Sequence, residues 1–135
     1  FRRVLFRSYD AVYQSPTKPT QYVGVHQNGG TLIAVVFDEM PMSGVAISTP
    51  GLGSITPTTL SFWEVMSGPI VGNVANVAGQ QYFAGCSMGW SLTFSDTGFV
   101  AVATVSTNTA RGNAAGLNCA LGVPVGSVRT FVKVF

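Results

Sequence analysis

Alternation of apolar and polar side chains predicts a β-hairpin in the second half of the chain. Over residues 90–94, Trp, Leu and Phe alternate with Ser and Thr, and successive side chains on a strand point to opposite faces. A Ser-Asp-Thr-Gly segment interrupts the run. There Asp96 can hydrogen-bond its own backbone, and Gly98 can adopt the positive φ that a hairpin loop with a bulge requires. Residues 99–106 follow as a β-branched strand that begins apolar on both faces, as in a central strand.

The rest of the chain repeats this pattern in shorter pieces, and we expect an all-β fold. Asn28-Gly29 is a strong hairpin signal, Asp38-Glu39 is expected to end the strand that follows it, and Ser67-Gly68-Pro69 is expected to turn the chain. Besides the two strands of the central hairpin, strands are expected at 9–14, 21–27, 30–37, 44–48, 60–66 and 128–135, and weaker strand patterns, interrupted by Gly and Asn, occur at 71–78 and 81–84. About eight short strands with a turn every eight to twelve residues are typical of an antiparallel β-sandwich or a small β-barrel.

The length of 135 residues suits one domain. Hydrophobic residues make up 47% and charged residues 9%, which is too apolar for a disordered chain. Gly, Pro and Ser interrupt every apolar stretch, so we expect no transmembrane helix. Low charge together with many Gly and Thr residues favours an extracellular β-protein over a cytosolic enzyme.

The first eight residues, Phe1–Ser8, match residue for residue the translation of a common sequencing adapter, which suggests a metagenomic source. We therefore interpret residues 1–8 as an artefact and residues 9–135 as a single β domain whose true N-terminus is missing. Without Arg2, Arg3 and Arg7, four basic residues face five acidic ones, and the net charge becomes −1 instead of +2. No basic patch remains, so we expect no nucleic-acid partner.

Four segments, in order, resemble a β-rich domain of secreted and cell-surface proteobacterial proteins. Residues 22–38 resemble its "HQG-D-T" hairpin, and Gly68-Pro69 resembles its "tGP" turn. Leu92–Asp96 is similar to its "L-T-F-T-D" strand, and Thr130–Phe135 to its terminal "R-Q-V-F" strand. The chain lacks the family's leading "W-W-N-P" element and its middle "P-V-W" strand. The resemblance implies a secreted, non-catalytic bacterial domain of uncharacterised function, and it supplies no site residues.

Catalytic chemistry finds little support in the residues. The single histidine, His26, could approach Asp38 across the first hairpin, but no Gly-x-Ser-x-Gly elbow accompanies it. Glu64 with Asp38 or Asp96 could form the carboxylate pair of a glycosidase. No CxxC or HxxxH spacing points to a metal site. We expect no cofactor, no metal and no enzyme activity, and we expect His26 to be a half-exposed residue on a strand.

Cys86 and Cys119 form the clearest pair of chemically related residues. In a secreted context two cysteines more often pair than stay reduced, and a disulfide here would hold the central hairpin. Two buried thiols are the alternative. Trp63, Tyr82 and Trp90 are candidates for ligand binding, and a place in the hydrophobic core is the alternative for each of them.

These observations predict a non-catalytic secreted, periplasmic or cell-surface β domain with a structural or binding role. The alternative is a small-ligand-binding barrel similar to avidins or lipocalins, with a tryptophan lining its mouth. The sequence does not identify the partner, which could be a small ligand or another domain of a larger surface protein.

Overall fold

The computed structural model describes residues 8–41, 47–49, 51, 53–55, 59–81, 86–108 and 119–135, and their side chains at 8–38, 51, 64–80, 86–108 and 119–135. Residues 1–7 of the adapter-like segment lie outside these ranges, so the interpretation of residues 1–8 stays a prediction.

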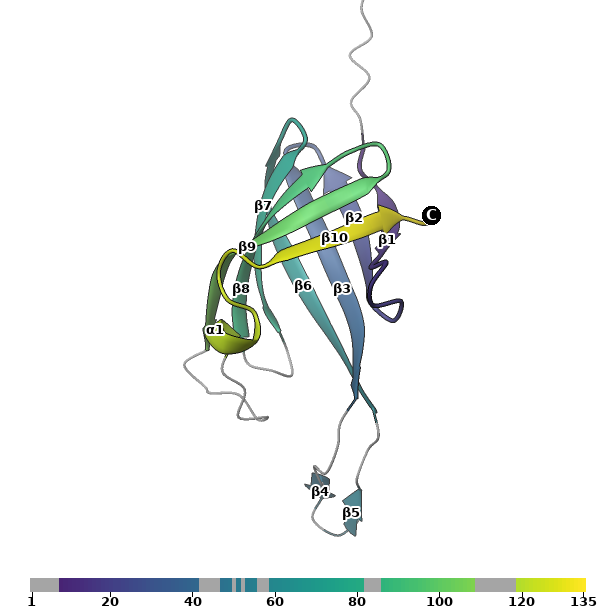
Figure 1. Cartoon of the computed structure of the whole chain (residues 1–135), viewed down its shortest axis with the longest axis vertical. Coiled ribbons are helices and arrows are strands. Elements are labelled where there is room, and N and C mark those ends of the chain that lie inside the picture. Colours follow the sequence, from purple (N-terminus) through teal and green to yellow (C-terminus); the bar gives the residue numbers. More distant parts are fainter. Residues whose placement is uncertain are drawn as a thin grey trace, which may run out of the picture.

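Eight antiparallel strands form a closed barrel in which sequence neighbours pair (Figure 1). Its strands are β1 (Ala11–Gln14), β2 (Tyr22–Asn28), β3 (Thr31–Pro41), β6 (Thr59–Val71), β7 (Val74–Gln81), β8 (Cys86–Phe94), β9 (Gly98–Asn108) and β10 (Val128–Lys133). β1 pairs with both β2 and β10, which closes the sheet. A separate two-stranded sheet, β4 (Ile47–Thr49) and β5 (Gly53–Ile55), comes between β3 and β6 in the chain, and helix α1 (Cys119–Gly122) precedes β10. The all-β prediction is therefore confirmed, and its architecture is the barrel.

The two ends of the barrel differ in their connections. At one end, which we name the hairpin end, short turns join β2 to β3, β6 to β7 and β8 to β9. Gly29 and Gly72 provide the positive φ, 59° and 62°, that two of these turns need. At the other end, which we name the loop end, longer connections join β1 to β2, β3 to β6 and β9 to β10, and α1 lies there (Figure 1).

Side chains alternate strictly between the interior and the outer surface along β3. Leu32, Ala34 and Val36 are buried, whereas Ile33 and Val35 between them are exposed. This period of two is what a strand with one core face requires. The same rule places Leu92 and Phe94 of β8 inside, as the alternation in the sequence predicts.

Aromatic rings fill the interior toward the hairpin end. Tyr9 stacks on Phe94 at a centroid distance of 4.5 Å, and Phe99 stacks on Phe131 at 4.8 Å. Tyr13 contacts both Phe94 and Phe99 edge-on. These five rings come from β1 and its N-terminal flank, β8, β9 and β10, so they join the first and last strands to the middle of the chain.

Glycine roles correct two of the expectations. The central hairpin forms, but Gly98 is not among the positive-φ residues; a Cβ there would collide with the carbonyl oxygen of Phe131, so close approach of β10 requires the glycine. The predicted turn at Ser67-Gly68-Pro69 is wrong, because β6 continues through it to Val71. Gly68 is needed because its Cβ would meet the carbonyl oxygen of Asn76 on β7.

We expect Gly68→Ala to destabilise the protein by at least about 2 kcal/mol, because a methyl group must push two paired strands apart. Gly24→Ala is the matched control on an adjacent part of the sheet, since nothing lies within 4 Å of its Cβ position. That variant should change the free energy of unfolding by less than about 0.5 kcal/mol. Urea denaturation of both variants measures the difference, and equal midpoints would contradict this account.

Burial of Tyr13 predicts a late step in the alkaline titration. Desolvation, helped by nearby Tyr9 and Asp10, raises the pKa of Tyr13 from 10.0 to about 12. The unfolded chain therefore ionises first, and this contribution to stability is intact below about pH 10 and is lost between about pH 10 and 12. Tyrosinate absorbance should show one delayed group that Tyr13→Phe removes. A single transition near pH 10 that includes every tyrosine would contradict the raised pKa of Tyr13.

Candidate functional site

A carboxylate lies inside the barrel near the loop end. Asp38 continues the inward-facing series of Ala34 and Val36 on β3 and is only 2% exposed. The expectation that Asp38-Glu39 ends the strand is wrong, because β3 pairs with β6 as far as Pro41. A buried carboxylate loses its hydration and needs strong donors around it.

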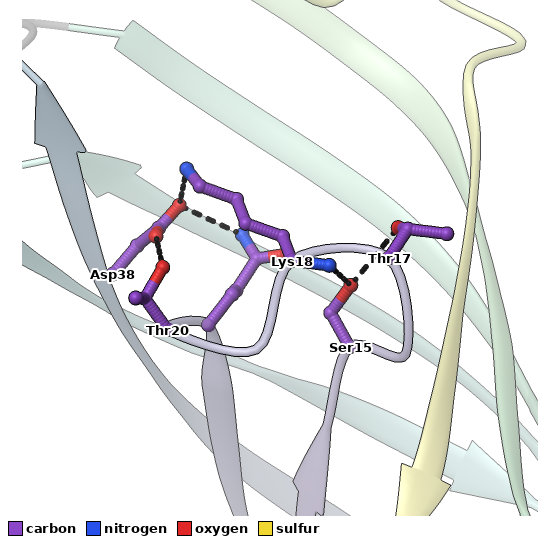
Figure 2. Close-up of polar contacts among 6 residues, drawn as sticks. Ser15, Thr17, Lys18, Thr20 and Asp38 are labelled. Atoms are coloured by element: carbon purple, nitrogen blue, oxygen red, sulfur yellow. Dashed lines mark hydrogen bonds and ion pairs between the residues drawn. The ribbon is translucent and has the colours of Figure 1, made fainter.

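The β1–β2 connection provides those donors. Lys18 Nζ lies 2.5 Å from Asp38 Oδ2, and Gln21 Nε2 donates to the same oxygen at 3.2 Å. Thr20 Oγ1 donates to Asp38 Oδ1 at 3.5 Å. Figure 2 shows Lys18 and Thr20 pointing from the loop to the carboxylate. The Lys18 side chain is 41% exposed, so the ion pair joins the barrel interior to the surface.

The connection that carries Lys18 is internally ordered. Ser15 N donates to the carbonyl oxygen of Gln21 at 3.0 Å, and Gln21 N donates to that of Lys18 at 2.9 Å. The buried Ser15 hydroxyl accepts from Lys18 N at 3.1 Å and lies 3.3 Å from the Thr17 hydroxyl (Figure 2). The loop therefore presents its lysine to Asp38 as a preformed unit.

A second carboxylate faces the interior close to the first. Glu64 is 3% exposed and pairs across the sheet with Val36, which precedes Asp38 by two positions on the same face. Asp38 and Glu64 are therefore diagonal neighbours on adjacent strands, a relation that brings long side chains within reach of each other. Asp96, the other carboxylate considered with Glu64, lies in the β8–β9 turn at the hairpin end and cannot share this site.

Trp90 and the disulfide form another part of the interior. Trp90 is partly buried and packs against both the main core and a smaller cluster of Cys86, Met88 and Cys119. The predicted disulfide is confirmed: Cys86 and Cys119 are bonded, with a Cα–Cα distance of 5.8 Å.

Two hydrogen bonds hold helix α1 beside the disulfide. The buried Ser106 hydroxyl donates to the carbonyl oxygen of Cys119 at 2.9 Å, and Cys119 N donates to Asn108 Oδ1 at 3.0 Å. Together with the disulfide, these contacts fix α1 against β8 and β9 at the loop end.

The other residues singled out from the sequence do not join this site. Trp63 pairs with Phe37 in the backbone register, but its side chain and all of Tyr82 lie outside the described residues. Ligand binding by Trp63, Tyr82 and Trp90 stays a prediction. The suggested approach of His26 to Asp38 is wrong, because His26 faces outward, where its Nδ1 lies 3.5 Å from Asp10 Oδ1.

Comparison with known proteins adds no assignment: no family model, no curated protein and no solved structure matches the chain. The resemblance to a secreted proteobacterial domain therefore stays a prediction. Within the described ranges, no group of three or more His, Cys, Asp or Glu side chains could hold a metal ion. No helix in the described part of the chain has the length and apolar character to cross a membrane.

A double-mutant cycle should detect the Lys18–Asp38 interaction. We expect the double variant Lys18→Met, Asp38→Asn to be less destabilised than the sum of the two single variants. The difference in the free energy of unfolding should be about 1 kcal/mol, a small value because Lys18 is partly exposed to solvent. Lys133→Met is the matched control, because Lys133 bonds through its backbone to Thr97 at the hairpin end. The changes that Lys133→Met and Asp38→Asn make to the free energy of unfolding should be additive. Additivity in both cycles would show that the ion pair contributes nothing.

Proposed function

We propose that this protein is a non-catalytic barrel that binds a small ligand at its loop end. The supporting observation is the placement of Asp38 and Glu64, two nearly fully buried carboxylates, inside that end. The hairpin end contains aromatic rings instead. Apolar side chains of similar size are usually cheaper to bury than carboxylates, which favours a role for Asp38 and Glu64 beyond packing.

The surroundings of the carboxylates define the chemistry of the proposed ligand. Met66, Met88 and Trp90 contribute apolar surface to the inner wall, and adaptable methionines suit small apolar groups. Asp38 already accepts a hydrogen bond from the ammonium group of Lys18. A ligand with an apolar body and one ammonium group could replace Lys18 at Asp38 while the β1–β2 connection moves aside. In this exchange Asp38 binds the ammonium group of the ligand, and Lys18 competes with the ligand for Asp38.

The disulfide supports the proposed location. Disulfides persist in oxidising compartments and are rare in the cytosol, and Cys86 and Cys119 form one. We therefore propose that the protein acts in the periplasm, at the cell surface or after secretion, and the resemblance to a proteobacterial domain favours a bacterial source.

Thermal denaturation of the full chain with 2-phenylethylamine, and with 2-phenylethanol as the uncharged match, tests the proposal. The amine should raise the melting temperature, and the alcohol should not. A ligand at 100 times its dissociation constant stabilises by about 2.7 kcal/mol. Asp38→Asn should abolish the effect of the amine. Lys18→Met should strengthen it about tenfold in affinity, because the competing ammonium group is gone.

The opposite responses of these two variants separate binding from general stability. If neither the wild-type chain nor Lys18→Met responds to the amine, or if Asp38→Asn responds as the wild type does, the loop end is not the anchor of such a ligand.

A further inference from the structure

The outer surface of the barrel carries an apolar face over β1, β2, β3 and β6. One row of paired residues crosses these four strands in the order Val12, Gly24, Val35 and Val65. Tyr22 and Phe37 form a pair on one side of the row, and His26 and Ile33 form a pair on the other. We name as the apolar face the outward-facing residues Val12, Tyr22, Gly24, Ile33, Val35, Phe37 and Val65. Five of them are large hydrophobic residues with 36–43% of their surface exposed.

The apolar face contains a hollow as well as projecting side chains. Nothing lies within 4 Å of a Cβ at Gly24, so the surface sinks at this residue. A shallow groove of about 520 Å³ runs over it and is lined by apolar residues, with Asp10 and His26 among its walls. Phe37, 43% exposed, projects from the same face two positions beyond Val35. From strand spacing and rise, Phe37 and Gly24 stand about 8 Å apart.

The opposite side of the barrel is different. The outward side chains of β7 and β8 there are mostly polar and small, and include Asn76, Gln80, Ser91 and Thr93. Val100, Val105, Val128 and Val132 are exposed on β9 and β10 as well. Polar or small residues flank two of them across the sheet: Val100 lies between Thr93 and Thr130, and Val132 lies between Gln14 and Gly98. A large contiguous apolar patch marks a surface that a partner covers.

The size and charge of the face indicate what the partner is. Its large side chains, together with Phe135 at the groove, expose on the order of 500 Å² of apolar surface. A stable interface buries about 800 Å² per partner, of which about 60–65% is apolar. None of the seven residues of the face is Lys, Arg, Asp or Glu, so the face itself brings no like charges together. Asp10, which lines the groove beside the face, lies 3.5 Å from His26 Nδ1.

We propose that the apolar face is the interface of a homodimer of this chain. A two-fold axis between Phe37 and Gly24 places the ring of each copy over the hollow of the other. Such a contact is isologous, because the same patch supplies both the projecting group and its receptor. The two sheets then stack face to face, and the interior sites of both barrels stay outside the interface.

Sedimentation velocity of the full chain, from low micromolar to submillimolar concentration, tests this interface. The wild-type chain should sediment as a dimer. Val35→Lys should raise the dissociation constant by about 100-fold or more, because it places an ammonium group at the centre of the interface. Val100→Lys is the matched control: Val35 and Val100 are outward strand valines with 41% and 40% exposure. The control should remain a dimer.

Gly24→Leu provides an independent variant that does not add charge. Its side chain enters open space in the isolated barrel, so the fold should persist, but it fills the hollow that receives Phe37. This variant should also dissociate. A wild type that is monomeric throughout the concentration range overturns the proposal, and so does a monomer that instead cosediments with phosphatidylcholine vesicles. Equal dissociation of the Val35→Lys and Val100→Lys variants overturns it as well.

Discussion

Closure between β1 and β10 is the constraint on which the barrel depends, because a sheet has an inside only when its first and last strands meet. β1 is four residues long, and its register with β10 joins Tyr13 to Lys133 and Gln14 to Val132. Val12 adds backbone bonds to the last two residues, Val134 and Phe135. So few hydrogen bonds need support from packing, and the rings behind the seam provide it: Tyr13 from β1 meets Phe99, and Phe99 stacks on Phe131 from β10. Apolar contact between the rings therefore holds the first and last strands together.

Once the barrel is closed, the cost of an inward side chain depends on the end at which it lies. Toward the hairpin end, short turns and aromatic rings leave an apolar medium in which a charge has no partner. At the loop end, a connection long enough to fold over the opening brings Lys18, Thr20 and Gln21 to Asp38. The length of the connections therefore determines whether polar donors can reach an inward side chain at that end. One end buries apolar groups, and the other buries a carboxylate that a partly exposed lysine reaches.

Local pattern was sufficient for the parts of the structure that depend on one strand and its neighbour. Alternation located the β8–β9 hairpin, and the two cysteines were paired correctly. The series Leu32, Ala34, Val36 and Asp38 contained the signal for an inward carboxylate, but an acidic residue was taken for a strand end. Gly68-Pro69 was taken for a turn, although a glycine also permits two strands to approach closely. Sandwich and barrel could not be distinguished, and Lys18 could not be assigned to Asp38, since both depend on contacts between segments distant in the sequence.

The seam has a consequence for how the chain reaches its native state. In the barrel, two pairings join strands that are not consecutive in sequence: β3 with β6, and β1 with β10. All the other pairings join consecutive strands, so a curved meander can assemble from local contacts before β1 and β10 meet. Until the seam forms, β1 and β10 are open edges with unsatisfied backbone groups. At high concentration β1 of one molecule can complete the sheet of another, using the native register between Tyr13 and Lys133. A swap of β1 between molecules is therefore the misassembly that this topology permits, and burial of the Tyr13 ring in the closed barrel opposes it.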